Sequence, residues 1–296
     1  MSSDKAGSSG AGASPGKRTT DRSLDDFLER EALSARMGRI GRKILVLSGK
    51  GGVGKSTVAA NLAIALAKAN KHVGLLDVDI HGPSIPRLLG LEGQMAGSTG
   101  KGIEPIEYDT RLKVMSIGFM LQNRDDAVIW RGPLKMNVIK QFLKDVEWGE
   151  LDFLVVDCPP GTGDEPLSVA QLIGNADGAV IVTTPQELAI SDVRKCVTFC
   201  RKLDLPVIGV VENMSGFVCP HCGKRSDIFK SGGGEAMAAD MDIPFLGRVP
   251  LDPEVVLASD RGELYLQAQN DSETARAFRG VVQPILDMTH NGPAVG

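Results

Sequence analysis

Residues 43–57 read KILVLSGKGGVGKST, and this stretch decides the fold. Residues 43–47 form a short apolar run without alternation, which is typical of a strand that is buried on both faces of a sheet. Residues 49–56 satisfy the pattern G-x-x-x-x-G-K-[ST] in full, and residues 56–69 have a helical pattern. A glycine-rich turn that follows a strand and opens a helix is the context in which this pattern forms a phosphate-binding loop.

The loop supplies the groups that would bind ATP. Its glycines let the chain turn tightly with backbone N–H groups pointing inward, and the N-terminus of the following helix adds a positive dipole. We expect Lys55 to reach the β- and γ-phosphates, Ser56 to ligate Mg²⁺ and Thr57 to lie near the α-phosphate. The nucleotide contacts expected from the loop are Gly49, Lys50, Gly51, Gly52, Val53, Gly54, Lys55, Ser56 and Thr57.

Aspartates end two further strand candidates. Asp157 ends the apolar residues 153–157 and precedes CPPG, a Walker B pattern in which the carboxylate holds the hydration shell of Mg²⁺. Gly161 follows as a switch residue whose N–H could approach the γ-phosphate. Asp77 and Asp79 lie at the end of residues 72–79, and strand ends in such sheets face the ligand crevice.

The remaining chain continues the alternation of strands and helices. Apolar strand candidates separated by helical patterns specify a mostly parallel sheet. We therefore predict an α/β P-loop NTPase, with a twisted sheet flanked by helices on both faces. The further strands are expected at residues 114–119, 179–183, 207–211 and 244–249, and the further helices at 134–146, 166–173 and 190–203.

Composition sets the limits of the domain. Residues 1–22 are rich in Ser and Gly and read as a disordered tail, residues 23–290 as a single P-loop ATPase domain, and residues 291–296 as a flexible C-terminus. The net charge of −4 disfavours a nucleic-acid binder. No apolar run approaches the roughly 20 residues that span a bilayer, and no secretory signal is evident. The odd count of 5 cysteines suggests a reducing cytosol, so we expect a cytoplasmic protein.

Cys219 and Cys222 form a C-x-x-C pair in the loop at residues 219–222. The spacing allows a redox dithiol, a zinc site or an iron–sulfur site. A tetrahedral Zn²⁺ or a [4Fe–4S] cluster typically needs four protein ligands, and a two-fold dimer would supply two pairs. Cys196 and Cys200, spaced i, i+4 on an apolar helix face, are expected in the core.

Several motifs together resemble the Mrp/ApbC family, in particular its cytosolic nucleotide-binding-protein branch, and the resemblance covers residues 40 to 262. They are GKGGVGKST, LLDVDIHGPSIPRLLG, VIWRGP, DCPPGTGDE, TTPQE, VENMSGFVCPHC and GRVPLDP. The resemblance implies a homodimeric or heterodimeric ATPase, with slow hydrolysis coupled to its task, that assembles or carries a [4Fe–4S] cluster and passes it to apo-proteins. The larger eukaryotic branch member carries an N-terminal four-cysteine motif, whereas this chain has no cysteine before Cys158.

Residue roles follow from the same resemblance. The form KGGVGK[ST] is similar to the deviant Walker A of SIMIBI-class NTPases, in which the early lysine, here Lys50, reaches the nucleotide of the partner subunit. Asp79 would orient the attacking water and Asp77 would support the Mg²⁺ site, so that Lys50, Lys55 and Asp79 would be the catalytic residues. Asn213 would read the adenine edge. The cluster would be bridged by Cys219 and Cys222 from both subunits.

Two rival functions stay open. A MinD/ParA-type positioning ATPase shares the deviant loop, but membrane positioning would require a basic amphipathic C-terminal helix. The helical pattern at residues 272–288 instead mixes both charges, and this rival leaves the cysteine pair unexplained. A zinc-bridged scaffold dimer explains the pair but leaves the intact phosphate loop without a role.

Overall fold

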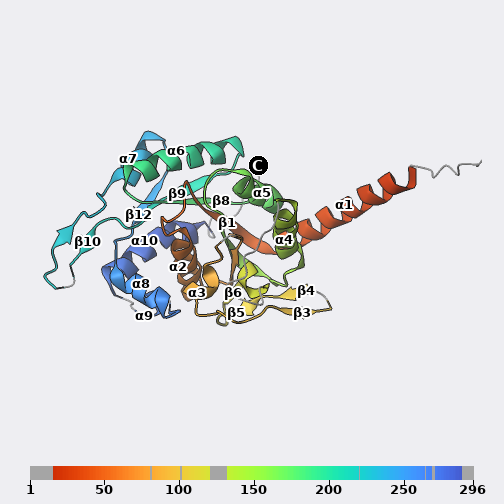
Figure 1. The fold of residues 1–296 in the computed structure, drawn as a ribbon, viewed down its shortest axis with the longest axis horizontal. Coiled ribbons are helices and arrows are strands. Elements are labelled where there is room, and N and C mark those ends of the chain that lie inside the picture. The colour runs from red at the N-terminus through yellow and green to blue at the C-terminus, as the bar shows by residue number, and fades with distance from the viewer. Residues whose placement is uncertain are drawn as a thin grey trace, which may run out of the picture.

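A computed structural model describes residues 16–80, 82–100, 102–120, 132–219, 221–263, 265–268 and 271–288. Its centre is an 8-stranded sheet in the order β12-β9-β8-β1-β7-β2-β6-β5 (Figure 1). Every strand pair in it is parallel except β5 with β6. The strands are β1 Ile40–Ser48, β2 Val73–Asp77, β5 Ile106–Glu107, β6 Leu112–Ser116, β7 Leu151–Asp157, β8 Gly178–Thr183, β9 Val207–Glu212 and β12 Phe245–Arg248.

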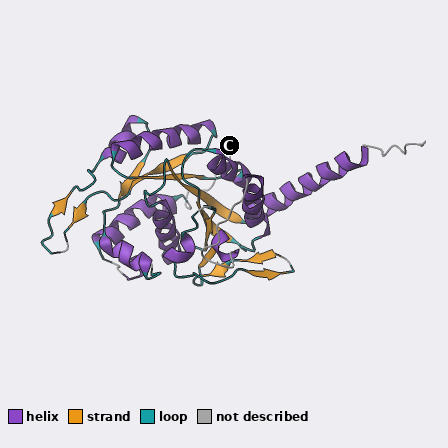
Figure 2. Cartoon of the chain, viewed as in Figure 1, coloured by secondary structure: helices purple, strands orange, loops and turns teal. Residues whose placement is uncertain are grey.

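Helices cover both faces of this sheet, which confirms the predicted fold class. Helices α5, α6 and α7 lie on one side, and α2, α8 and α10 lie on the other (Figure 2). Because both faces are covered, β8 is buried throughout and β1 and β7 are buried except near their starts, so these strands read as apolar runs in the sequence. The helices are α1 Gly16–Met37, α2 Lys55–Lys68, α3 Ile85–Leu88, α4 Gly132–Asp145, α5 Asp164–Ile173, α6 Glu187–Lys202, α7 Gly233–Asp240, α8 Pro253–Asp260, α9 Tyr265–Ala268 and α10 Glu273–Asp287.

One strand prediction is partly wrong. The apolar residues 114–119 were expected to be a single strand, but β6 ends at Ser116 and Ile117–Met120 is a 3-10 turn. The Ser116 hydroxyl accepts a hydrogen bond from the N–H of Gly118 at 3.1 Å. This side chain therefore competes for the backbone and ends the strand.

The predicted N-terminal tail also needs correction. Helix α1 begins at Gly16, inside the segment 1–22 that was expected to be disordered, and it projects from the body (Figure 1). Its C-terminal half is anchored on α4, where Glu29 pairs with Lys140 and Lys144 and the Arg36 Nε donates to the Lys144 carbonyl at 3.1 Å. Extending an anchored helix costs little per residue, so a polar sequence can remain helical beyond its contacts. Residues 1–15 of the predicted tail and residues 291–296 of the predicted C-terminus lie outside the described residues. Residues 128–131 of the motif VIWRGP also lie outside them.

Two short hairpins complete the fold. Strands β3 Gly97–Thr99 and β4 Gly102–Glu104 form one, and β10 Phe217–Val218 with β11 Arg225–Ser226 form the other, which carries the cysteine pair. Within the described ranges, no helix is long and apolar enough to cross a membrane.

Candidate functional site

The parallel sheet brings the predicted site residues to one edge. Strand β1 ends in the phosphate loop, and its neighbours β7 and β2 end in Asp157 and Asp77. Asp157 is paired in register with Val46 on one side and with Asp77 on the other. Parallel strands of matched register therefore place the carboxylates beside the loop, as the sequence predicts.

The glycines of the loop serve two purposes. Gly54 has φ of 80° and caps the start of α2, and a Cβ added there would lie 2.2 Å from Nδ2 of Asn213. A Cβ on Gly49 would lie 2.4 Å from the backbone of Asp192. A Cβ on Gly51 or Gly52 would meet nothing within 4 Å. Gly49 and Gly54 thus let neighbouring segments pack against the loop, while Gly51 and Gly52 leave its outer side open to a ligand.

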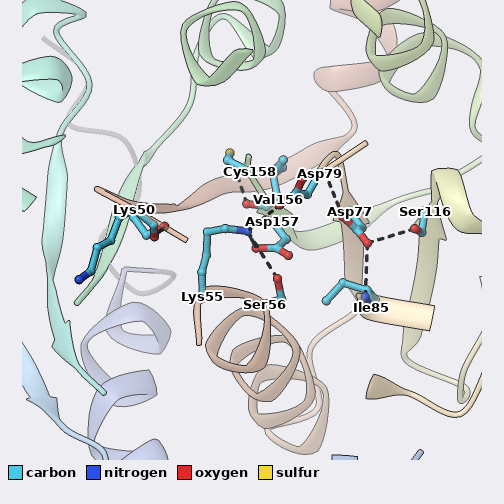
Figure 3. A network of polar contacts seen from close by, with 11 residues as sticks. Lys50, Lys55, Ser56, Asp77, Asp79, Ile85, Ser116, Val156, Asp157 and Cys158 are labelled. Atoms are coloured by element: carbon cyan, nitrogen blue, oxygen red, sulfur yellow. Dashed lines mark hydrogen bonds and ion pairs between the residues drawn. The ribbon is translucent and has the colours of Figure 1, made fainter. Parts of the chain in front are cut away.

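Lys55 is the centre of a buried charge cluster. Its Nζ lies 2.6 Å from Oδ1 of Asp157, 4.0 Å from Oδ2 of Asp79 and 3.5 Å from Oγ of Ser56 (Figure 3). The Lys55 side chain is 6% exposed and Asp157 is fully buried. Burial lowers the pKa of Lys55, but the nearby carboxylates, Asp157 foremost, outweigh it and raise that pKa above its ordinary value. The lysine is therefore held as a cation inside the protein.

Asp157 retains capacity for a further partner. Burial raises its pKa, and the charge of Lys55 opposes that shift. Its Oδ2 is buried and has no hydrogen-bond partner among the described residues. A buried carboxylate oxygen that is unsatisfied, close to the hydroxyl of Ser56, is the donor set that a hydrated Mg²⁺ prefers. The residues present therefore fit the magnesium ion that the sequence predicts.

Asp77 lies beside Asp157 at the buried end of β2. Its Oδ1 accepts from the N–H of Asp79 at 3.0 Å, and its Oδ2 accepts from Oγ of Ser116 at 3.1 Å and from the N–H of Ile85 at 3.3 Å (Figure 3). Burial, with the charge of Asp157, raises the pKa of Asp77 to about 8. Both oxygens accept hydrogen bonds from neighbouring chain segments, so Asp77 could support a Mg²⁺ site indirectly, by positioning Asp79, and that role stays a prediction.

Asp79 instead lines a cavity of about 250 Å³ over the phosphate loop. The rest of its wall comes from Ser48, from the loop and the start of α2, and from Ser84, Leu88 and Pro160. Burial raises the pKa of Asp79, against the opposing charge of Lys55. The cavity thus joins the phosphate loop and a carboxylate in one space, which is what phosphoryl transfer to water requires.

Lys50 and Gly161 occupy the rim of the same region. Lys50 is half-buried, points away from the Lys55 cluster and makes no ion pair with any described residue (Figure 3). Gly161 has φ of 93°, and its N–H donates to the Ser48 carbonyl at 2.9 Å. A contact from Gly161 to a γ-phosphate would require this bond to open, and both residue roles stay predictions.

A second cavity of about 210 Å³ adjoins the first and shares Gly54, Thr57 and Leu88 with it. Asn213 lies in its wall and is 7% exposed, and its Nδ2 donates to the Val53 carbonyl at 2.9 Å. The opposite wall comes mostly from residues 249–260, which the sequence analysis did not assign to the site. The motif GRVPLDP within that stretch was the available signal.

Asp252 organises this opposite wall. One of its carboxylate oxygens accepts from Oη of Tyr265 at 2.6 Å and from Oγ1 of Thr274 at 2.7 Å. The other accepts from the N–H of Glu254 at 3.0 Å and so caps helix α8. Three helices that are separate in the sequence are thereby fixed around one cavity.

The cysteine pair lies on the β10–β11 hairpin. Cys219 is half-buried, Cys222 is exposed, and both thiols are free. Backbone N–H groups of His221 and Cys222 point toward the Cys219 sulfur and lower the pKa of that thiol. Among the described residues, no group of three or more His, Cys, Asp or Glu side chains could hold a metal ion, so one chain offers two thiolates.

The other cysteines behave as predicted. Cys196 and Cys200 lie on the inner face of α6 and are buried. Cys158 is also buried, and burial raises the pKa of its thiol well above the ordinary range. These thiols are packed in the core and cannot supplement the exposed pair.

Comparison with known proteins agrees with this arrangement. A family model described as "ParA: NUBPL iron-transfer P-loop NTPase" matches residues 39–286. A "Cytosolic Fe-S cluster assembly factor NUBP2 homolog" from Trichoplax adhaerens is 50% identical over 253 residues, which cover 84% of this chain and 96% of that protein.

Two solved structures are similar as well. An ADP complex of a nucleotide-binding protein from Archaeoglobus fulgidus is 44% identical with a TM-score of 0.71, covering 79% of this chain and 92% of that one. The cell division ATPase MinD of Pyrococcus furiosus is 25% identical with a TM-score of 0.60, covering 84% and 99%. The chain therefore belongs to the NUBPL iron-transfer P-loop NTPases, which confirms the Mrp/ApbC-type family that its motifs predict.

Proposed function

We propose that this protein is an ATP-hydrolysing assembly and carrier protein that binds a [4Fe–4S] cluster between two subunits and transfers it to apo-proteins. The observation that carries the proposal is the presence, in one chain, of a nucleotide site and a hairpin with two free thiols, one half-buried and one exposed, that have no third metal ligand beside them among the described residues. Neither rival function uses both features. The relative from Trichoplax adhaerens, named as an iron–sulfur assembly factor, supports it.

The nucleotide half of the proposal uses the buried charge cluster. Lys55 would exchange its ion pair with Asp157 for the β- and γ-phosphates, which frees the Asp157 carboxylate for the Mg²⁺ shell beside Ser56. When bound, Mg²⁺ would offset phosphate charge. Asp79 would orient the attacking water. The hydrogen bond from its own backbone N–H to Asp77 would hold Asp79 in place. Hydrolysis would be slow and coupled to cluster transfer.

The second cavity would take the adenosine. Its position directly beside the phosphate loop is where the base of an ATP with phosphates on Lys55 would fall. Asn213 would read the adenine edge from the wall of this cavity. The archaeal relative that crystallised with ADP supports a nucleotide at this place.

The cluster half requires two copies of the chain. A [4Fe–4S] cluster takes four thiolates, and Cys219 and Cys222 supply two. A two-fold dimer, of this chain or with a related family subunit, would bring two such pairs together. Lys50, whose side chain makes no ion pair with the described residues of its own chain, would reach the nucleotide of the other subunit. We place the protein in the cytosol, as the name of the relative suggests.

The two halves are connected through a short segment. Asn213 bonds to Val53 of the phosphate loop, and two residues later the N–H of Ser215 donates to the Val249 carbonyl at 2.9 Å. The N–H of Leu251 donates to the Gly216 carbonyl at 2.7 Å, and strand β10 follows at once. A displacement of Asn213 by nucleotide would therefore act within a few residues of Cys219. ATP can control the cluster only if its affinity differs between the two arrangements of this segment.

The first experiment is anaerobic reconstitution with iron and sulfide. We expect a broad absorption band in the visible blue and about four irons per dimer. Cys219→Ser should abolish both, whereas His221→Ala, which changes the exposed residue between the thiols, should retain them. A colourless protein that holds zinc would support the scaffold dimer instead. A metal-free protein that still hydrolyses ATP would support the positioning ATPase.

The coupling has its own test in Arg225, which ties the hairpin to the body. Its Nη1 lies 3.2 Å from Oε1 of Glu273, and its Nη2 donates to the Ser215 carbonyl at 3.4 Å. Arg225→Ala should keep the iron content but reduce the ratio of cluster-transfer rates with and without ATP. Arg261→Ala, which removes an exposed surface pair with Glu263, is the matched control. An unchanged ratio in Arg225→Ala would refute this route of coupling.

A further inference from the structure

A third cavity, with the basic side chains Arg30 and Lys43 in its wall, lies at the opposite edge of the sheet from the phosphate loop. Its volume is about 270 Å³, and it is enclosed by α1, the start of β1 and the end of α5. Helices α1, α4 and α5 follow one another on this side of the molecule (Figure 1). Lys43 contributes to it from β1, five residues before Ser48, which is roughly 17 Å along the strand. A ligand in this cavity would therefore leave the ATP site free.

The wall formed by α1 is a single helical stripe. Arg30, Leu33, Ser34 and Met37 recur at the three- and four-residue steps that share one helix face. Glu29 and Arg36 lie on another face and hold α1 on α4. The anchoring contacts thus fix the orientation of the stripe toward the cavity.

Lys43 is an unusual residue to find here. It is 9% exposed, and its side chain makes no hydrogen bond or ion pair with any described residue. The carboxylate of Asp177, which lies beside the Lys43 backbone, is already committed, because its oxygens accept from Nη1 of Arg42 and from the backbone N–H of Lys43. Arg30, at the rim, is exposed and likewise has no partner among the described residues. Buried charges are normally paired, so this cavity is arranged to receive a negative charge.

The walls define which anion fits. Leu33, Met37, Leu172 and Ile173 make them largely apolar. The helix end that lines the cavity is the C-terminus of α5, whose carbonyl dipoles disfavour any anion, and a multiply charged one more than a single carboxylate. Phosphate sites use helix N-termini and converging N–H groups instead. Two basic side chains among apolar walls match a single carboxylate that carries an aliphatic group.

We propose that this cavity binds an aliphatic carboxylate, with Lys43 and Arg30 pairing with its oxygens and the four apolar side chains enclosing its hydrocarbon part. Such a group occurs in small organic acids and at the C-terminus of a peptide that ends in an apolar residue. The site is independent of the nucleotide and the cysteine pair, so its failure would leave the proposed function untouched.

The test is a titration of the full chain with methyl-labelled methionine and leucine, followed by NMR. The probes are 4-methylpentanoate, N-acetyl-glycyl-leucine, the C-terminal amide of that dipeptide, and inorganic phosphate. We expect saturable shifts of the Met37 and Leu33 methyl signals with both acids, at about 1 mM for the smaller one. The amide and phosphate should bind at least about tenfold more weakly. Tighter binding of 4-methylpentanoate would point to a small organic acid, and tighter binding of N-acetyl-glycyl-leucine would point to a peptide C-terminus.

Variants separate the site from a structural lysine. Lys43→Met should weaken binding by about tenfold or more, because a charge-assisted hydrogen bond is lost, whereas Lys43→Arg should retain it. Lys71→Met removes another lysine at this edge of the sheet that does not line the cavity, and it should bind as the parent protein does. Arg30→Gln is the second test should Lys43→Met fail to fold. Three results would each overturn the proposal. They are equal binding of the acid and its amide, unchanged binding of the acids to both Arg30→Gln and Lys43→Met, and the absence of any saturable shift.

Discussion

Replacing Lys55 with alanine should destabilise the nucleotide-free protein, in addition to weakening its binding of ATP. Lys55 is the one cation within 4.0 Å of Asp157 and Asp79 among the described residues, and Asp77 lies beside them. Without it, three carboxylates share a buried site. Lys55→Ala would therefore lower the stability of the folded protein as well as its affinity for phosphate.

The magnitude follows from burial. Lys55 is 6% exposed and Asp157 is fully buried, so solvent screens their pair very little. Removing one partner of a buried ion pair typically costs about 3–5 kcal/mol. Asp157→Asn should cost less, because Lys55 would keep Asp79. In the double variant Lys55→Ala/Asp157→Asn the orphaned charge is gone, so most of the stability should return.

The assay is urea unfolding of all four proteins without nucleotide and with a metal chelator, from pH 4 to pH 8. Burial raises the pKa of Asp157 and Asp77 in the folded state, and loss of the Lys55 charge would raise both further. The folded variant then binds protons that the unfolded chain releases above the ordinary value of 3.8. Its stability must fall as pH rises through that window. The difference from the parent protein should be smallest near pH 4 and largest near pH 8.

Two results would refute this reasoning. One is a Lys55→Ala variant that unfolds within about 0.5 kcal/mol of the parent protein at every pH, well below the cost of an orphaned buried charge. The other is a double variant that is no more stable than Lys55→Ala. Either would mean that water or structural relaxation compensates the carboxylates, and that the pair seen in the structure contributes little.

Three other perturbations have defined outcomes. Gly54→Ala should lower the free energy of unfolding by about 1–2 kcal/mol, because the backbone there is left-handed, and its Cβ should displace Asn213. Gly51→Ala is the control, because a Cβ there has open space. A fluorescent ATP analogue should bind more weakly to Gly54→Ala than to Gly51→Ala. Asp252→Ala removes a helix cap and the acceptor of two hydroxyl groups, so thermal unfolding should show a loss of about 2–4 kcal/mol. Asp79→Asn should retain ATP binding but lower kcat at least about 100-fold, measured by phosphate release; unchanged turnover would exclude Asp79 as the residue that orients water.

The sheet and the phosphate loop could be predicted because their signals are local. A parallel strand covered on both faces must be apolar throughout, as β8 is, and the loop sequence is fixed by turn geometry and phosphate contact. The place of Asp77 could not be predicted, because its partners come from residues 79, 85 and 116, which only the fold brings together. A sequence shows that a carboxylate ends a strand, but not which neighbours use its oxygens.

The start of α1 and the cavity around Lys43 escaped prediction for related reasons. Polar composition at residues 16–22 is compatible with disorder and with a helix that projects into solvent, so the pattern cannot separate them. Lys43 lies directly before the apolar run of β1 and has no motif around it that indicates a ligand site. Only the packing of α1 and α5 shows that its side chain lines a cavity without a partner among the described residues. The residues 249–260 join the second cavity in the same way, by long-range packing.

Two groups that ATP would use already have partners within the protein, and this has a consequence for coupling. Lys55 is bound to Asp157, and the Gly161 N–H is bound to Ser48, so both groups that ATP would use are already occupied. Binding of Mg²⁺ and ATP would be an exchange of partners rather than an addition of contacts. The net free energy of that exchange is all that can be transmitted to Asn213 and the thiol hairpin, since a ligand shifts an equilibrium only by its differential affinity. A protein whose Lys55–Asp157 pair is very stable would bind ATP weakly and have little free energy left to drive a switch, whereas one with a weak pair would bind tightly and have more.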